Sequence, residues 1–488
     1  FGSRHLSQVF TFANSMTTSK GVHIRNAIIL ACAVDAADKA LLPATFKALT
    51  ESMYVGPREL GALTFAQSIA FSLALPIWGS LLRYYPARQL LVSGCCLWST
   101  STLFISATTT FRQQFLLRLL NGAALAAVNP LGQAVLCDVI PEAERGRAFG
   151  LVGSASSAMT MLVGAVATAT ASKTVGGMAG WRACHMGMSA VSFVVALLLH
   201  LTIPSGISSP AKPSGLSWFG EQRQVVRMIL RKPTFVILVL QGVTGGIPWN
   251  GFAFLTLFFQ LSGYTDLQTG QIILCGGIGG AVGGYLGGVL GDLADRHYPN
   301  IGRVATAQLS VFLGTLFFVT VMCVPYAPGS FLTVSLVYFL FNLTACWTPA
   351  AACRPICGSI FRDSRDRAQV LALWIALEGI SASVLGAPLA GTLSEAFGFR
   401  LQSRGTPSAA APGAGGVDAL RTALMGVAIV PWILCFLAWL PMYYTLPRDH
   451  CLEDPGENGN AEMSGLRSKK EEGGTYSPVP VQIGARTE

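Results

Sequence analysis

Long apolar segments alternate with short polar ones along almost the whole chain. Each apolar segment has about 20 residues or more, enough for a helix to cross the hydrocarbon core of a bilayer. The stretches between them are polar or rich in Pro and Gly. We therefore predict twelve membrane-spanning helices, at 24–49, 59–82, 87–108, 112–138, 147–171, 183–203, 233–262, 267–291, 302–325, 329–358, 367–394 and 418–446.

The twelve segments form two related sets of six. GSLLRYYPARQLL (79–91) and GDLADRHYPNIGRV (291–304) follow the second helix of each set, and PEAERGRAFGL (141–151) and RDSRDRAQVLA (362–372) follow the fourth. Matching segments in the same order indicate an internal duplication, and many secondary transporters are built from repeats. The pattern thus predicts an all-α integral membrane protein of two pseudo-symmetric six-helix bundles.

Composition agrees with a protein whose solvent is lipid. The chain is 52% hydrophobic and 12% charged, whereas soluble domains carry about 25% charged residues. Its net charge is +9, but the Lys and Arg residues lie between the apolar segments instead of gathering on one solvated face. This distribution excludes a nucleic-acid-binding protein.

The distribution of Lys and Arg also predicts the orientation. They are more frequent in the loops after even-numbered helices, so the positive-inside rule places both termini in the cytosol. The cellular membrane is not indicated. Arg223, Arg227 and Arg231 predict a basic amphipathic helix on the cytosolic leaflet, an ordinary charged linker being the alternative. The predicted divisions are a cytosolic segment 1–23, bundles 24–203 and 233–447, the linker 204–232 and a disordered cytosolic tail 448–488.

Several motifs resemble one transporter family. GDLADR (291–296), followed by Arg303, resembles the cytosolic loop signature of the major facilitator superfamily. DKALLPATFKAL, RLLNGAALAAVNP, ASKTVGGMAGWR and QGVTGGIPWNGFAF resemble an uncharacterised plant, algal and protist branch that is similar to Spinster-like transporters. The resemblance implies the major facilitator fold, in which two bundles rock about a central site. Arg83 replaces the signature Asp in the first half, and Leu125 stands where Spinster-like proteins carry an acid after Arg118.

The first predicted helix contains three charged residues, Asp35, Asp38 and Lys39. A charge at the bilayer centre costs at least about 2.5–3.5 kcal/mol, so each must face protein or water and find a partner. Asp35 and Lys39 are four residues apart and can pair. Asp38 then needs another cation, for which Arg118 and Arg354 are candidates, and Glu378 is a further buried acid.

Two interpretations of these charges stay open. They line an aqueous pathway, where they bind a polar substrate head and take up a proton at Asp35 or Asp38, or they form a fixed network that joins helices. Uncharged polar groups at membrane depth have the same two roles. Gly245, Gly246 and Pro248 predict a bent or broken helix at this depth, as in many transporter sites. The polar candidates are Asn121, Asn129, Gln241, Trp249, Asn250, Asn342 and Trp347.

The polar loops contain a candidate cytosolic gate. We expect Arg83 to pair with Asp138, and Asp295 to pair with Arg365 or Arg367, so that each half keeps one ion pair. The residues assigned to this gate are Gly79, Arg83, Asp138, Arg145, Arg147, Gly291, Asp292, Asp295, Arg296, Arg365 and Arg367.

Glycines recur every four residues in the eighth helix, at Gly276, Gly280, Gly284 and Gly288. Such stripes let helices approach closely. We interpret this one as a smooth surface on which the two halves slide, with static packing as the alternative.

The predicted function is a secondary transporter or facilitator for a small organic solute, with proton coupling as one option. Similarity to Spinster-like proteins favours a lysolipid or sphingoid-type amphiphile, with sugars and organic anions as other candidates. A non-transporting membrane sensor is the alternative. Cys353 and Cys357 lack further zinc-like ligands and the six histidines are scattered, so we expect no metal, cofactor or enzymatic activity. The expected partners are the solute, the lipid bilayer and, if coupled, protons, and we expect a monomer.

Overall fold

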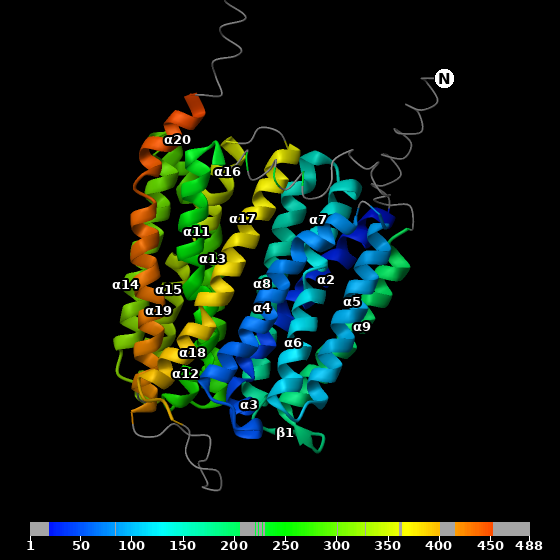
Figure 1. Cartoon of the computed structure of the whole chain (residues 1–488), viewed down its shortest axis with the longest axis vertical. Helices are drawn as coiled ribbons and strands as arrows, with labels where there is room; N and C mark the ends of the chain where they lie inside the picture. The colour runs from blue at the N-terminus through cyan, green and yellow to red at the C-terminus, as the bar shows by residue number, and fades with distance from the viewer. Residues whose placement is uncertain are drawn as a thin grey trace, which may run out of the picture.

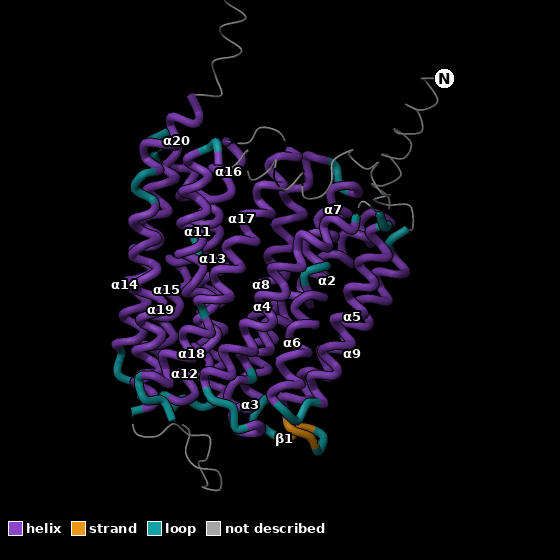
Figure 2. Tube along the Cα trace, viewed as in Figure 1, coloured by secondary structure: helices purple, strands orange, loops and turns teal. Residues whose placement is uncertain are grey.

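The structure is a computed structural model. It describes residues 19–82, 84–204, 230–299, 301–326, 328–360, 364–400 and 415–451, with the single residues 220, 223 and 227. Two helical bundles stand side by side in Figure 1, the first half in blue to blue-green and the second in green to orange. Helix dominates the described chain, as Figure 2 shows. The segment 1–18 and the tail from 452 onward lie outside the described residues, as does the predicted linker 204–232 apart from residues 204, 220, 223, 227 and 230–232.

The first half contains eight helices and one short hairpin in its described part. They are α2 (Ser19–Ala44), α3 (Phe46–Met53), α4 (Pro57–Leu81), α5 (Ala87–Ala107), α6 (Phe111–Leu125), α7 (Val128–Val139), α8 (Glu142–Thr170), β1 (Thr174–Val175), β2 (Met178–Ala179) and α9 (Gly180–Thr202). The two strands are antiparallel, with Thr174 opposite Ala179.

The second half repeats the arrangement. Its described elements are α11 (Pro233–Gly251), η1 (Phe252–Phe254), α12 (Leu255–Leu261), α13 (Asp266–His297), α14 (Gly302–Cys323), η2 (Pro328–Ser330), α15 (Phe331–Ala345), η3 (Pro349–Cys353), α16 (Arg354–Ile360), α17 (Ser364–Leu385), α18 (Ala387–Ala396), α19 (Gly416–Ala438) and α20 (Met442–Cys451). We call the end of the molecule that carries the start of α2 and the end of α20 the terminus side, and the end that carries α3 and β1 the far side (Figure 1).

Eleven helices of the described chain are long and apolar enough to cross a membrane. Many of their large apolar side chains face outward, such as Leu201 at 72% and Leu332 at 76% exposed, as expected for a surface in contact with lipid. Helix α2 is not among the eleven because every 18-residue window in its apolar part carries Asp35, Asp38 and Lys39 or the charges before them. It nevertheless packs along α8 and α9 and completes the first bundle.

Several spanning helices are interrupted near their middle. The chain passes from α6 to α7 at Ala126–Ala127, and from α17 to α18 at Gly386. The predicted break after Pro248 is present as the 3₁₀ turn η1, three residues after Trp249. The segment η3 is a π-helix, a form that is frequent at functional sites. Non-helical backbone at this depth is tolerated where protein or a cavity surrounds it.

Buried apolar side chains form separate clusters on the terminus side and one joint cluster on the far side. The joint cluster joins Phe46 and Trp181 of the first half to Phe254 of the second, and the Phe46 and Phe254 ring centroids are 5.1 Å apart. Another cluster, which includes Cys95 and Val135, belongs to the first half alone, and a third, with Phe235 and Trp439, to the second. The halves therefore share a core only on the far side.

Some glycines of α13 pack within the second half and others contact the first half, and the predicted sliding surface stays a prediction. Gly276 and Gly280 face side chains of α15 in the same half, Gly288 faces Ala350, and Gly284 has open space. On the neighbouring stripe, Gly279 and Gly283 face the backbone of α15, Gly287 faces Trp347 and Gly291 faces Ala351 of η3. Contact with the opposite half is made by Gly270, against Ala165, and Gly277, against Met161. Packing within the half is thus the role that the geometry supports for Gly276 and Gly280, whereas Gly284 has no such contact.

Two adjacent glycines of α13 should respond differently to the same substitution. A Cβ at Gly283 would lie 2.2 Å from the backbone oxygen of Leu343, whereas a Cβ at Gly284 would meet nothing within 4 Å. We expect Gly283→Ala to destabilise the protein by about 1–3 kcal/mol because α15 must move. Gly284→Ala should be neutral or stabilising. Thermal unfolding of both variants in detergent tests this, and equal stabilities would contradict the packing described here.

Candidate functional site

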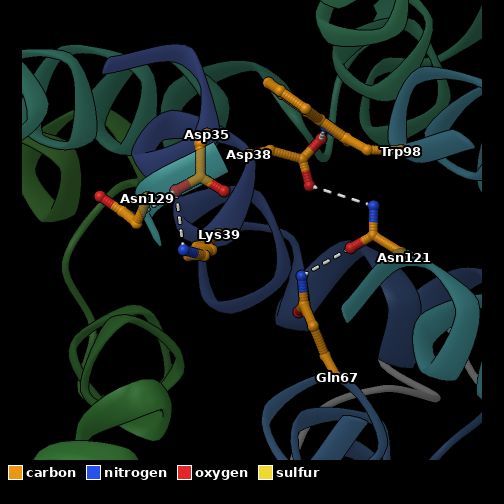
Figure 3. Close-up of polar contacts among 7 residues, drawn as sticks. All are labelled: Asp35, Asp38, Lys39, Gln67, Trp98, Asn121 and Asn129. Atoms are coloured by element: carbon orange, nitrogen blue, oxygen red, sulfur yellow. Dashed lines mark hydrogen bonds and ion pairs between the residues drawn. The ribbon is translucent and has the colours of Figure 1, made fainter. Parts of the chain in front are cut away.

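The carboxylate of Asp38 is the centre of a buried polar cluster in the first half (Figure 3). Asp38 is 1% exposed. Its Oδ2 accepts hydrogen bonds from Trp98 Nε1 at 3.1 Å and Thr102 Oγ1 at 2.9 Å, both on α5. Asn121 Nδ2 on α6 lies 3.5 Å from Oδ1 and donates to Thr102 at 2.9 Å. Gln67 of α4 donates to Asn121 Oδ1 at 2.8 Å, so the cluster joins four helices.

Asp35 and Lys39 form the predicted pair on the neighbouring face of α2. The Nζ–Oδ2 distance is 2.8 Å, and Asn129 of α7 donates to the same oxygen at 3.2 Å. Lys39 also lies 4.0 Å from the centroid of the Phe71 ring, a cation–π contact with α4. Asp35 is buried while Lys39 is one-third exposed. Asp35 Oδ1 has no hydrogen-bond partner among the described residues, so one acceptor is left for a proton or water.

Arg118 does not form the direct ion pair with Asp38 that the sequence suggests. Its Nη2 lies 2.9 Å from Nε2 of His185 on α9, and its charge attracts Asp38 from beyond contact distance. His185 Nδ1 lies 2.7 Å from the backbone oxygen of Trp181, which can only accept, so Nδ1 carries the proton. Nε2 of the neutral ring is then free to accept from Arg118. Asp38 is held instead by neutral donors, and Arg354, the other proposed cation, lies in the second half.

His185 is a site residue that sequence reasoning missed. It is 67 positions from Arg118 in the chain and stands in an otherwise apolar helix, where a lone histidine carries no motif. Two guanidinium nitrogens of Arg118, Nε and Nη1, and both amide atoms of Gln114 one turn earlier have no partner among the described residues. A buried cation with free donors is expected to hold water or a ligand group.

A cavity of about 430 Å³ lies in the second half. Four of the predicted site residues are part of its wall: Gln241, Trp249, Arg354 and Glu378. The wall also includes Trp374, Trp432 and the π-helical segment at Pro349 and Cys353. A cavity of this size, mostly apolar with a few polar groups, is typical of a site for a small organic molecule.

Glu378 sits in a notch that two glycines of α11 leave open. A Cβ at Gly246 would be 3.1 Å from Glu378 Oε1, and one at Gly242 would be 3.4 Å from Oε2. No hydrogen bond or ion pair to this carboxylate is present among the residues that the structure describes. The adjacent Gly379 faces Ser72 of α4, so the notch borders the opposite half. Glu378 is therefore a half-buried carboxylate without a protein partner, at the edge of a cavity.

Three other predicted residues lie outside the wall of this cavity. Asn342 donates to the backbone oxygen of Tyr338 at 2.9 Å, and Trp347 packs on Gly287 of α13. Asn250 donates to Ser68 of α4 at 3.2 Å and accepts from the backbone nitrogen of Ala387 at 3.4 Å. Asn342 bonds within its own helix α15, whereas Trp347 and Asn250 contact other helices, the second of the two roles considered for them.

Two gate carboxylates of the second half pair with Arg303, and the predicted pairing of Asp295 with Arg365 or Arg367 stays a prediction because those side chains are not described. Asp295 Oδ2 accepts from Arg303 Nε at 3.0 Å, and Asp292 Oδ1 lies 2.7 Å from Arg303 Nη2. Arg303 Nη1 donates to the backbone oxygen of Ala351 at 3.1 Å. One side chain thus ties together the end of α13, the start of α14 and η3.

The remaining gate positions are only partly described. Arg83 lies outside the described residues, as do the side chains of Arg145, Arg365 and Arg367. The predicted pairing of Arg83 with Asp138 therefore stays a prediction. Arg147 and Arg296 are exposed, Gly291 is buried against Ala351, and Gly79 has open space around it.

Besides the Asn250–Ser68 hydrogen bond, two polar contacts between the halves lie on the far side, and sequence reasoning missed these two. Lys47 Nζ of α3 is 2.8 Å from Asp266 Oδ1 of α13, and Glu395 of α18 accepts from the backbone nitrogen of Arg58 at 3.0 Å. Close backbone packing of α4 on α18 accompanies them, where Gly391 faces the backbone oxygen of Pro57. Together with the joint apolar cluster, these contacts close the far side of the molecule.

Removing one neutral hydrogen-bond donor to Asp38 should show how much the Asp38 cluster contributes to the stability of the protein. Thr102→Val leaves a buried carboxylate short of one hydrogen bond, which costs about 1–3 kcal/mol. Thr320→Val is the matched control, because Thr320 is exposed and donates only to its own helix. Thermal unfolding in detergent should give a lower midpoint for Thr102→Val alone. Equal midpoints would mean that the donors around Asp38 do not stabilise the fold.

Comparisons with known proteins agree with this architecture. The chain superposes on a bacterial homologue of the human lysosomal transporter Spinster in an inward-facing, unoccupied conformation, with a TM-score of 0.74 and 16% identity over 88% of this chain and 98% of that one. It also superposes on the nucleoside transporter NupG (TM-score 0.63, 13% identity, 88% and 100% covered) and a D-xylose–proton symporter (0.64, 15%, 88% and 98%). At these identities the superpositions establish the fold alone.

Sequence comparison gives the family. A probable L-galactonate transporter of Escherichia coli (strain K12) is 28% identical over 130 residues, which are 27% of this chain and 29% of the relative. The family model of the Major Facilitator Superfamily matches residues 28–353, in agreement with the resemblance seen in the loop motifs. The protein is a multi-pass membrane protein and belongs to the Major Facilitator Superfamily.

Proposed function

We propose that this protein is a secondary transporter that carries a small organic solute across its membrane by alternating access. The observation that carries the proposal is the cavity of about 430 Å³ in the second half, with Gln241, Arg354 and Glu378 in a wall that is otherwise largely apolar. Cavities of about 300–1,000 Å³ with few polar groups are the usual sites for such molecules.

Closure on one side supports the alternating-access part of the proposal. The Lys47–Asp266 pair and the joint apolar cluster hold the halves together on the far side, while the terminus side has a separate apolar cluster in each half. A solute would then exchange with the terminus side in this conformation and with the far side after these contacts break. If the termini are cytosolic, as the positive-inside rule predicts, this conformation opens to the cytosol.

The related proteins suggest several chemical classes for the solute. The proteins of related fold or sequence are named as carriers of a nucleoside, D-xylose and L-galactonate, and one as a homologue of Spinster. Sugars, organic anions and lysolipid-type amphiphiles are therefore the first candidates. The same Asp38 and Asp35 carboxylates that hold α2 in place are the candidate sites for a coupling proton, since Asp35 Oδ1 has no partner among the described residues.

Uptake into proteoliposomes tests the proposal. With a gradient of one pH unit, one-to-one electroneutral proton coupling would accumulate a solute about tenfold. We expect the parent protein to accumulate at least one member of a panel of sugars, organic anions, amines and amphiphiles. Asp35→Asn or Asp38→Asn should carry the same solute only downhill, without response to the gradient, because the amide cannot take up the proton.

The control for this experiment is Asp418→Asn. Asp418 forms an exposed pair with Arg421 at 2.8 Å on the far side, away from the cavity, and its loss should leave uptake unchanged. If no solute moves under any gradient, the transport proposal is wrong. If solute moves uphill equally well in both α2 variants, transport stands and the coupling site lies elsewhere.

A further inference from the structure

We infer that the cavity of the second half binds the positively charged amine group of an organic cation, held by the Glu378 carboxylate and the faces of three tryptophans. This inference rests on the proposed function, because it names the chemistry of the solute that the cavity takes. It differs from the sugar and anion chemistries that the names of the related proteins suggest.

The first step is the charge of the cavity. Glu378 lines it and has no hydrogen bond or ion pair to the described protein. Arg354 lines the same cavity but makes no ion pair with Glu378 within 4.0 Å and is itself exposed. A carboxylate shielded from bulk water by helices is costly to leave without a partner. A cationic ligand supplies the missing partner, whereas an anionic one would add to the cost.

The second step is the nature of the wall. Trp249, Trp374 and Trp432 come from α11, α17 and α19 and line the cavity together with Glu378. The ring centroids of Trp249 and Trp432 are 6.3 Å apart at 65°, so these two rings form a corner instead of a flat stack. Tryptophan faces attract cations more strongly than other rings, and groups of aromatic rings are how proteins recognise alkylated ammonium groups.

The third step is why these side chains stay available to a ligand. Trp249 is 41% exposed even though its ring also packs on Phe252 and Phe341, which fix its orientation. Trp374 is buried, and its Nε1 has no partner among the described residues. Gly242 and Gly246 leave the space that Trp374 and Glu378 occupy. The aromatic faces and the carboxylate are therefore held in place before any solute arrives.

Three probes of similar size and different charge separate the possibilities. Benzyltrimethylammonium is the cation, benzyl alcohol the neutral molecule and benzoate the anion. Binding is measured on the purified full chain in detergent, by tryptophan fluorescence and by the shift of the thermal midpoint. We expect saturable binding of benzyltrimethylammonium and at least tenfold weaker binding of the other two, which corresponds to about 1.4 kcal/mol.

Variants assign the binding to the cavity. Glu378→Gln and Trp249→Leu should each lower the affinity for benzyltrimethylammonium by about tenfold or more. The first variant removes the negative charge, and the second removes one aromatic ring from the wall. Glu51→Gln, which removes an exposed carboxylate of α3, should leave the affinity unchanged. Trp249→Leu keeps the test decisive if Glu378→Gln does not fold.

Each outcome bears on one proposal. Equal binding of all three probes, a preference for benzoate, or an unchanged cation affinity in the folded Glu378→Gln and Trp249→Leu variants would overturn the amine inference. Cation binding that follows the pattern above, with no uptake of any solute into proteoliposomes, would support the inference and overturn the transport proposal. Uptake of a sugar or anion without cation binding would support the transport proposal and overturn the amine inference.

Discussion

A buried carboxylate in a membrane-embedded helix bundle must be surrounded by hydrogen-bond donors. In the first half, the carboxylate that imposes this requirement on its neighbours is Asp38. Trp98 and Thr102 of α5 and Asn121 of α6 all donate toward it. None of these donors is charged, and the buried Arg118 acts on the carboxylate only from beyond contact distance, so neutral hydrogen bonds satisfy Asp38. The positions of α2, α5 and α6 relative to one another follow from this requirement, and Gln67 extends it to α4.

The two halves share one fold but differ in how their buried polar groups are bonded. In the first half the carboxylates of α2 are bonded to neighbouring helices, and Asp35 Oδ1 and two guanidinium nitrogens of Arg118 on α6 have no partner among the described residues. In the second half the half-buried Glu378 lines a cavity and has no partner among the described residues. The far-side contacts of α3 and α4 with α13 and α18 connect the first half, whose buried carboxylates are hydrogen-bonded, to the second half, which contains the cavity. Movement of one half against the other would then expose the cavity to either side in turn, as the proposal requires.

Sequence patterns predicted the fold well because a membrane-spanning helix leaves a long apolar segment. The spacing of Asp35 and Lys39 also determined their pairing, since residues four apart share a helix face. Polarity at membrane depth identified Gln241, Trp249, Arg354 and Glu378, which line one cavity. The contacts that sequence reasoning missed depend on which helices lie next to each other in the structure. Neutral donors to Asp38 carry no charge signal, and His185 is brought to Arg118 only by the packing of α9 on α5 and α2.

The glycines of α13 show a further limit. Successive residues on a helix point about 100° apart, so the stripes beginning at Gly276 and Gly279 look alike in sequence and face different neighbours in the structure. Likewise the pairing of Asp295 with Arg303 depends on where α14 begins, and element boundaries are the part of a helix pattern that sequence specifies least.

The central claim is that the halves rock so that one side opens as the other closes. Double electron–electron resonance can measure it, with spin labels in a cysteine-free background at Ile77 and Leu290 on the terminus side and at Glu51 and Leu267 on the far side. Combining Lys47→Ala with Glu395→Ala removes two far-side contacts, the ion pair to Asp266 and the acceptor of the Arg58 backbone N–H. The account predicts a longer far-side distance and a shorter terminus-side distance in the same sample. A far-side distance that lengthens while the terminus-side distance stays fixed, or two unchanged distances, would contradict it.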